Sequence, residues 1–151
     1  MYKDPVNKIK LIPTPKSVDI AITGRCNLKC KYCFYANEMT ALKDLSLEEW
    51  KGFFKELKRL NVLRATLTGG EPFTRSDLFK IIDEIISNRM RYNILTNGTL
   101  IDEKLLNRFD KGKRRLRLDS IQVSIDGSTA EIHNQSRPDS FEKAVQGLRL
   151  L

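Results

Sequence analysis

Four short stretches of the chain carry apolar residues spaced as in a half-buried β-strand. They are residues 18–22, 65–67, 92–95 and 121–125. A period of two sends neighbouring side chains to opposite faces, so these stretches predict four strands.

The stretches between and after them have apolar residues at every third or fourth position, which predicts amphipathic helices. The first helix is expected to begin at Ser46, because Ser-Leu-Glu-Glu at 46–49 is a capping box. Three more are expected: one from near Ser76, one over residues 105–109 and one from near Ser140. Four strand–helix units in series predict an α/β fold with a parallel sheet and right-handed crossovers. The apolar face of the first helix comprises Leu47, Trp50, Phe53, Phe54, Leu57 and Leu60.

Each predicted strand ends in a distinctive polar or glycine-rich group. Three cysteines follow the first strand, and Gly-Gly-Glu-Pro at 69–72 follows the second. Thr-Asn-Gly at 96–98 closes the third, and Ser-Ile-Asp-Gly at 124–127 closes the fourth. Parallel α/β sheets bind ligands beyond the carboxyl ends of their strands, so these four groups predict one shared site.

The three cysteines have the spacing C-x3-C-x2-C, at Cys26, Cys30 and Cys33. An odd number of cysteines without a secretion signal argues against a disulfide framework. Structural zinc needs four ligands, and the single histidine, His133, lies far along the chain. A redox pair of Cys30 and Cys33 would leave Cys26 unexplained. A cubane iron–sulfur cluster held by three cysteines would keep one iron open for another ligand.

The cysteine segment, with Tyr32 directly before its last cysteine, resembles the cluster motif of radical S-adenosylmethionine (SAM) enzymes. The resemblance extends to the other three strand-end groups and to His133 and Arg137. Cys-Phe-Tyr at 33–35 and the stretch 124–137 are most similar to sulfatase maturases and SPASM peptide maturases. The resemblance covers residues 17–151.

That resemblance implies a partial (βα) barrel as the radical SAM core domain over 17–151, after an extended lead-in over 1–16. It implies that Cys26, Cys30 and Cys33 ligate three irons of a [4Fe-4S] cluster, with SAM on the fourth. An electron from a flavodoxin- or ferredoxin-type donor would cleave SAM to a 5′-deoxyadenosyl radical. The radical would abstract hydrogen from a peptide or protein substrate.

The resemblance and the residue chemistry together nominate cofactor contacts. Gly69 and Gly70 lack Cβ atoms and allow a close backbone approach to a ligand. Glu71 offers a carboxylate to the SAM ammonium. Tyr32 is expected to approach the adenine through its backbone. For Gly69 and Gly70 the alternative is a simple turn, and for Glu71 it is a solvated surface position.

The later strand ends nominate three more contacts. Ser124 is expected to hydrogen-bond the ribose or the methionine end of SAM, and Arg137 to grip its carboxylate as a planar fork. Asn97 is expected beside the adenosine or just behind it, although Thr-Asn-Gly is also a good turn sequence. Asp126 is expected to shape a turn, and His133 to be a packed or capping histidine. No residue is assigned a catalytic role.

The family's barrel has about six strand–helix units, and four are visible here. We therefore expect a fragment, a split reading frame or one half of an enzyme completed by a second chain. Cofactor-biosynthesis enzymes of the molybdopterin or modified-haem type share the same motifs and stay open as alternatives. So does an inactive remnant that binds cluster and SAM without turnover.

Composition adds little to this. The 27 Lys and Arg against 19 Asp and Glu give a net charge of +8. The densest basic stretch, residues 111–117, is expected to be a loop. No aromatic residues interleave with it, which argues against a nucleic-acid partner, although a basic binding module is a third alternative. Without an apolar run of about 18 residues or a secretory signal, we expect a cytoplasmic protein without a membrane partner.

Overall fold

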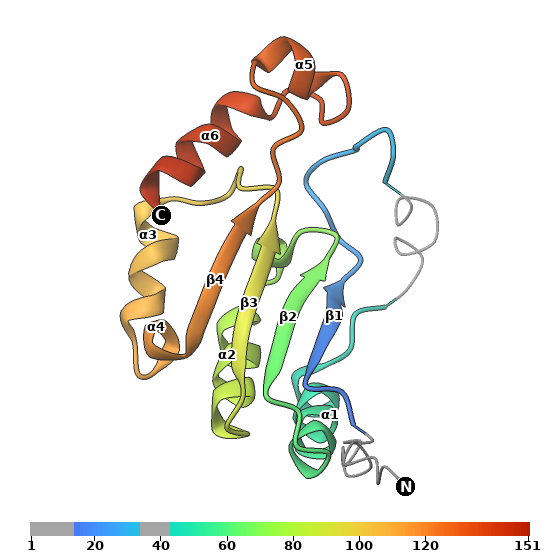
Figure 1. Ribbon diagram of the computed structural model, residues 1–151, viewed down its shortest axis with the longest axis vertical. Coiled ribbons are helices and arrows are strands. Elements are labelled where there is room, and N and C mark those ends of the chain that lie inside the picture. Colours follow the sequence, from blue (N-terminus) through green and yellow to red (C-terminus); the bar gives the residue numbers. More distant parts are fainter. Residues whose placement is uncertain (1–13, 34–42) are drawn as a thin grey trace, which may run out of the picture.

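A computed structural model describes residues 14–33 and 43–151. These residues form one four-stranded sheet in the order β1-β2-β3-β4, and every neighbouring pair is parallel (Figure 1). The alternation of strands and helices along the chain confirms the predicted α/β fold. The strands are β1 (Ser17–Thr23), β2 (Arg64–Gly69), β3 (Arg91–Thr96) and β4 (Leu118–Val123).

Helical segments follow each strand. None of the helices in the described ranges is long and apolar enough to cross a membrane. The α-helices are α1 (Leu47–Arg59), α2 (Leu78–Ser87), α3 (Glu103–Leu106), α4 (Arg114–Arg117), α5 (Ala130–Asn134) and α6 (Phe141–Leu150), and the 3-10 helices are η2 (Pro72–Thr74) and η3 (Asn107–Asp110).

The capping box predicted at the start of α1 is confirmed. The Ser46 hydroxyl accepts from the Glu49 N–H at 3.3 Å, and the Glu49 carboxylate accepts from the Ser46 N–H at 2.7 Å. The buried face of the helix is narrower than its apolar pattern suggested, because Phe53 and Leu60 are exposed. Trp50, Phe54 and Leu57 are the residues of α1 that are buried.

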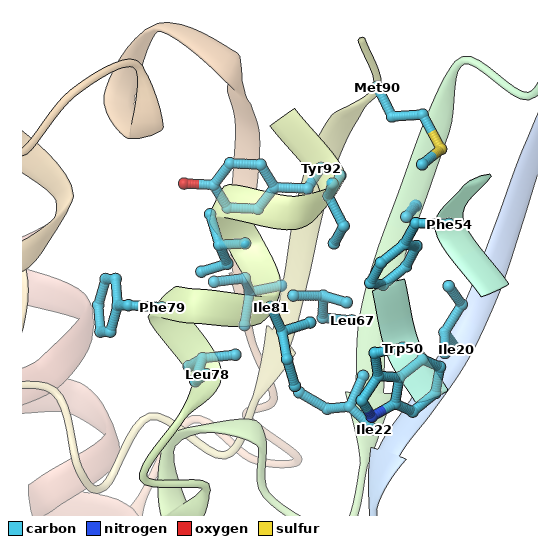
Figure 2. Packing of buried hydrophobic residues seen from close by; sticks show 14 of the residues in the cluster. Ile20, Ile22, Trp50, Phe54, Leu67, Leu78, Phe79, Ile81, Met90 and Tyr92 are labelled. Atoms are coloured by element: carbon cyan, nitrogen blue, oxygen red, sulfur yellow. The ribbon is translucent and has the colours of Figure 1, made fainter. Parts of the chain in front are cut away.

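The hydrophobic core lies between one face of the sheet and helices α1 and α2 (Figure 2). Alternate residues of the strands point into it, so the opposite face carries polar side chains such as Asn93 and Ser120. One face of the sheet is therefore packed against helices, and the other carries polar side chains. The core-facing strand residues are Ile20, Ile22, Ala65, Leu67, Tyr92 and Ile94.

Two local predictions need correction. The basic stretch 111–117 is not simply a loop, because its second half forms α4. Arg114 binds the Asp83 carboxylate on α2 at 2.7 and 2.6 Å, and its guanidinium lies 5.0 Å from the Phe79 ring centre. These contacts fix the segment. The fourth strand ends at Val123 rather than at residue 125, and the five-residue helix α5 was not foreseen.

The predicted lead-in over residues 1–16 lies largely outside the described residues, since positions 1–13 are not described. The carbonyl of Lys16 accepts from the Leu63 N–H at 2.9 Å, which joins the chain just before β1 to the chain just before β2. The division at residue 16 stays a prediction.

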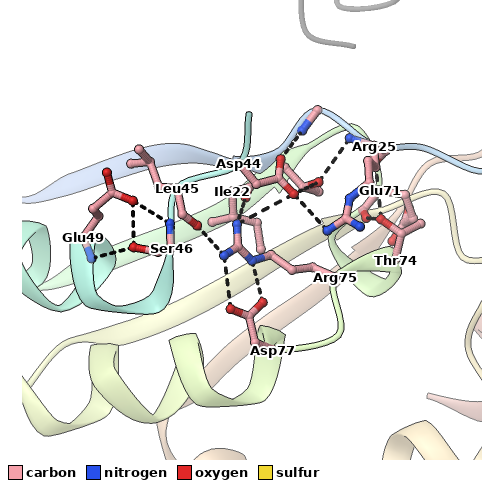
Figure 3. A network of polar contacts seen from close by, with 12 residues as sticks. Ile22, Arg25, Asp44, Leu45, Ser46, Glu49, Glu71, Thr74, Arg75 and Asp77 are labelled. Carbon is pink, nitrogen blue, oxygen red and sulfur yellow. Dashed lines mark hydrogen bonds and ion pairs between the residues drawn. The ribbon is translucent and has the colours of Figure 1, made fainter. Parts of the chain in front are cut away.

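A buried arginine ties three elements together at the carboxyl end of β1 (Figure 3). The guanidinium of Arg75 is 4% exposed and donates to the Ile22 carbonyl at 2.5 Å and to the Leu45 carbonyl at 2.6 Å. It also binds the Asp77 carboxylate at 2.7 and 3.1 Å. A guanidinium with five fixed donors suits a position where several acceptors converge. Arg75 therefore joins β1, the chain entering α1 and the start of α2.

The Arg75–Asp77 pair predicts a pH-dependent stability. Hydrogen bonds from Arg75 hold the pKa of Asp77 below its ordinary value. A lowered native pKa stabilises the fold above the unfolded pKa, and this contribution is lost as the pH falls through the native pKa. Asp77→Asn should therefore cost about 1–2 kcal/mol of unfolding free energy at pH 7 and almost nothing near pH 2.

Urea unfolding at both pH values measures this difference. Asp110→Asn is the matched control, because Asp110 pairs with Arg115 where both side chains are more than half exposed. It should cost less than about 0.5 kcal/mol at either pH. Equal costs for the two variants at pH 7 would contradict the role assigned to the buried pair.

Candidate functional site

The four strand-end groups meet around one cavity. The cavity has a volume of about 230 Å³. The structure therefore confirms that the cysteines, the glycine pair, the asparagine turn and the segment after β4 converge. The residues that line it are Cys26, Cys30, Tyr32, Cys33, Thr68, Gly69, Gly70, Leu95, Thr96, Asn97, Ser124 and Arg137.

The first half of the cysteine loop is fixed by the turn after β2. The Gly70 N–H donates to the Thr23 carbonyl and the Glu71 N–H to the Arg25 carbonyl, both at 2.8 Å. Asp44 accepts from the Thr23 hydroxyl at 2.8 Å and from the Gly24 N–H at 3.1 Å (Figure 3). These bonds fix residues 23–25, which lead directly to Cys26.

The neighbouring backbone leaves no room for a side chain at Gly69 or Gly70. A Cβ on Gly69 would lie 2.3 Å from the Thr23 oxygen, and Gly69 has a φ of +126°. A Cβ on Gly70 would lie 2.2 Å from the Arg25 oxygen. Both glycines line the cavity, but their missing side chains make room for the cysteine loop. Their expected close approach to a ligand stays a prediction.

Glu71 lies behind the cavity wall. Its carboxylate is fully buried and accepts from the Phe73 N–H at 3.1 Å, the Thr96 hydroxyl at 2.8 Å and the Asn97 N–H at 2.7 Å. Burial raises the pKa of Glu71, and these three donors oppose the increase. The carboxylate thus joins the ends of β2 and β3. Its expected contact with a SAM ammonium stays a prediction.

Asn97 connects the third strand end to the first cysteine. Its side-chain N–H groups donate to the side-chain oxygen of Asn27 at 2.9 Å and to the Cys26 sulfur at 3.9 Å. Its own side-chain oxygen accepts from the Thr99 hydroxyl at 2.7 Å. Asn97 lines the cavity beside Cys26, and its expected contact with the adenosine or just behind it stays a prediction.

Ser124 and Arg137 reach the cavity from the segment after β4. The Ser124 N–H donates to the Thr96 carbonyl at 2.9 Å, which continues the pairing of β3 and β4 past the end of the strand. Arg137 donates through Nε to the Asp126 carboxylate at 2.9 Å. Among the described residues, no partner is found for the two terminal amino groups of Arg137, and its side chain lines the cavity.

Asp126 is the site residue that the sequence did not reveal. We expected it to shape a turn, yet its Oδ2 atom accepts from Tyr32 at 2.5 Å, Ser136 at 2.9 Å and Arg137 at 2.9 Å. Burial would raise the pKa of Asp126, but the three donors hold it below its ordinary value. Burial and the bond to Asp126 raise the pKa of Tyr32 to about 12.

His133 is a packed histidine, as expected. It is fully buried; its Nδ1 accepts from the Asp126 N–H at 3.2 Å and its Nε2 lies 3.0 Å from the Ser140 hydroxyl oxygen. That hydroxyl donates to the Arg137 carbonyl at 2.8 Å. The Nε2 atom therefore carries the proton and donates to Ser140.

All three cysteines line the cavity. Burial raises the pKa of the Cys26 and Cys30 thiols, and the neighbouring cysteines add to the increase. Within the described ranges, no three Cys, His, Asp or Glu side chains gather closely enough to hold a single metal ion. A cubane cluster binds each thiolate to a different iron, so three thiols that line one cavity without converging on a single ion suit it better than they suit one zinc ion.

The chain matches the family model "Radical SAM superfamily" over residues 20–151. It belongs to this superfamily. Enzymes of the family use a [4Fe-4S] cluster and SAM, the cofactors expected from the cysteine motif.

Curated relatives include peptide-modifying proteins. The chain is 30% identical over 141 residues to the subtilosin biosynthesis protein AlbA of Bacillus subtilis, covering 92% of this chain and 31% of AlbA. It is 35% identical over 127 residues to the PqqA peptide cyclase of Granulibacter bethesdensis, covering 83% and 32%. It is also 31% identical over 146 residues to the AdoMet-dependent heme synthase of Methanosarcina barkeri, covering 95% and 41%. The chain thus spans between about a third and two-fifths of these relatives.

Solved structures confirm the partial barrel. The enzyme anSMEcpe with bound AdoMet superposes with a TM-score of 0.72 at 24% identity, over 91% of this chain and 40% of that one. SuiB of Streptococcus suis, bound to the precursor peptide SuiA, gives 0.69 at 23% identity, over 88% and 30%.

The glycine geometry predicts opposite effects at two glycines. Gly70→Ala should lower the unfolding free energy by about 2 kcal/mol or more, because its Cβ would meet the Arg25 backbone. Gly52→Ala on α1 meets nothing within 4 Å and should stabilise the chain by about 0.5–1 kcal/mol. Urea unfolding measures both, and a neutral Gly70→Ala would refute the close approach.

The three donors around Glu71 predict a cost for the isosteric amide. In Glu71→Gln one carboxylate oxygen becomes an NH₂ group that faces a donor, so the unfolding free energy should fall by about 1–3 kcal/mol. Glu56→Gln, at an exposed ion pair on α1, is the control and should cost less than about 0.5 kcal/mol. Equal stability of both variants in chemical unfolding would argue against the buried network.

Proposed function

We propose that this chain holds a [4Fe-4S] cluster through Cys26, Cys30 and Cys33 and binds SAM beside it. It would form the radical-generating core of an enzyme that abstracts hydrogen from a peptide or protein substrate. The observation that carries this is the convergence of all three cysteines with Ser124 and Arg137 on one cavity. When bound and reduced, the cluster supplies the electron that cleaves SAM to a 5′-deoxyadenosyl radical.

The chain's own residues provide binding and orientation. The terminal amino groups of Arg137 suit the SAM carboxylate, because a guanidinium binds a carboxylate as a planar fork. Ser124 offers a hydroxyl at the same wall, and Gly69 and Gly70 also line the cavity. Glu71 holds the ends of β2 and β3 together and so keeps Asn97 beside Cys26. Tyr32 lines the same cavity, and we propose that its backbone contacts the adenine.

A peptide substrate is favoured by the names of the relatives. AlbA acts in bacteriocin biosynthesis, PqqA peptide cyclase is named for a peptide, and the SuiB structure holds a precursor peptide. The match to the heme synthase includes 95% of this chain, and its 31% identity is similar to that of AlbA. Cofactor biosynthesis is therefore the second candidate. An electron donor of the flavodoxin or ferredoxin type and a cytoplasmic location complete the proposal, since thiols stay reduced there.

The outer edge of β4 is the place where further strands would complete the barrel. Among the described residues, β4 pairs with β3 alone. An apolar hollow beside it is lined by residues that include Leu118, Ile121 and Leu150. We propose that additional strands, from this protein or from a second chain, cover this edge, because exposed strand edges pair readily.

The proposal predicts loss of the cluster in Cys30→Ala. After anaerobic reconstitution, the wild-type chain should bind iron and sulfide and release 5′-deoxyadenosine when dithionite and SAM are added. Cys30→Ala should lose most of the cluster and all of the 5′-deoxyadenosine, because one iron lacks its thiolate. Lys29→Ala, at the exposed neighbouring position, is the control and should behave as wild type. Iron uptake that is equal in Cys30→Ala and wild type would overturn the ligand assignment.

Two further outcomes separate the alternatives. A wild-type chain that binds cluster and SAM but releases no 5′-deoxyadenosine fits the remnant interpretation. A chain that takes up no iron contradicts the proposed function.

A further inference from the structure

The two halves of the cysteine loop are held by different parts of the fold. The half before Cys26 is bound by the turn after β2 and by Asp44. The half that carries Cys30 and Cys33 makes two hydrogen bonds to the rest of the described chain. The Lys31 N–H donates to the Ser136 carbonyl at 3.0 Å, and the Tyr32 hydroxyl donates to Asp126 at 2.5 Å. Both acceptors lie in the segment after β4.

Asp126 is itself fixed in place. Its backbone N–H donates to the buried ring of His133 at 3.2 Å. The next residue, Gly127, packs closely on α5. A Cβ at this position would lie 2.7 Å from the backbone nitrogen of His133. The backbone that presents this carboxylate is therefore part of a rigid turn.

The same carboxylate oxygen also orients Arg137. It takes the Nε–H of the guanidinium at 2.9 Å, which leaves the two terminal amino groups for the cavity that Arg137 lines. The guanidinium carbon lies 5.5 Å from the centre of the Tyr32 ring, so arginine and tyrosine are also in contact with each other. One oxygen atom thus links the second half of the cysteine loop to the arginine of the cavity wall.

We propose that Asp126 is a positioning residue that couples the Cys30–Cys33 half of the cysteine loop to Arg137. The cluster site and the grip on the SAM carboxylate are then set by one shared carboxylate. The coupling follows from the contacts in the protein alone, and its consequence for SAM rests on the proposed function.

Three variants separate this coupling from general damage to the turn. Asp126→Asn keeps the shape and removes the charge that Arg137 and Tyr32 share. Tyr32→Phe removes the bond from the loop to Asp126 and leaves the bond to Arg137. Ser136→Ala is the matched control, because it removes the third donor to Asp126 but keeps the backbone carbonyl that accepts from Lys31.

The first readout is amide hydrogen exchange over residues 29–33 in the metal-free, full-length chain. Exchange should be about fivefold faster in Tyr32→Phe and Asp126→Asn than in wild type and unchanged in Ser136→Ala, because a lost hydrogen bond raises local opening. The second readout is the NMR signal of the Arg137 Nε–H, assigned with Arg137→Lys. It should stay protected in Tyr32→Phe and lose protection in Asp126→Asn.

The third readout is SAM affinity of the reconstituted chain by equilibrium dialysis. Asp126→Asn should bind SAM at least about tenfold more weakly than Ser136→Ala at equal iron content, since a charge-assisted bond orients the guanidinium. Exchange, Nε–H protection and SAM affinity equal to those of Ser136→Ala would overturn the proposal. If the wild-type chain binds neither cluster nor SAM, the proposed function fails, and the two metal-free readouts still decide whether Asp126 couples the loop to Arg137.

Discussion

A carboxylate without any exposed surface, that of Glu71, holds together the strand ends from which the site is built. It lies at the end of β2, and two of its three donors belong to Thr96 and Asn97 at the end of β3. A buried carboxylate is costly unless its oxygens are hydrogen-bonded, so this arrangement persists only when both strand ends keep their positions. The positions of these two strand ends also set the shape of the cavity. Gly70, just before Glu71, and Asn97, just after Thr96, both contact the chain around Cys26.

A second network, around Asp126, performs a similar task for the segment after β4. The two carboxylates differ in their environment. Glu71 is bound by neutral donors inside the protein, whereas Asp126 shares a charge with Arg137 at the cavity wall. Glu71 supports two strand ends, whereas Asp126 binds a side chain that lines the cavity. The buried carboxylate of Glu71 can therefore keep the strand ends fixed, while the more accessible carboxylate of Asp126 allows Arg137 to adjust to a ligand.

The sequence predicted the features that depend on local pattern. Strands with alternating apolar residues, the capping box at Ser46 and the convergence of four strand-end groups all follow from periodicity and from the geometry of parallel sheets. Contacts between distant residues were out of reach. Nothing in the sequence near Asp126 shows that Tyr32 lies beside it, and the helix α4 depends on Arg114 meeting Asp83 and the Phe79 ring. The glycine pair was recognised, but its steric reason lies in the backbone of residues 23–25.

The buried guanidinium of Arg75 has a consequence for how this site can diversify. It binds the carbonyl of Ile22, where the chain leaves the sheet, and that of Leu45, where the chain enters α1. The segment between Ile22 and Leu45 contains all three cysteines, and Arg75, which lies outside this segment, binds both of its ends. Lengthening a closed loop is cheap, about 0.6 kcal/mol for each doubling. Insertions between Cys33 and Asp44 can therefore accumulate over evolution while the sheet stays the same, whereas residues 23–25 and the spacing of the cysteines are constrained by their contacts.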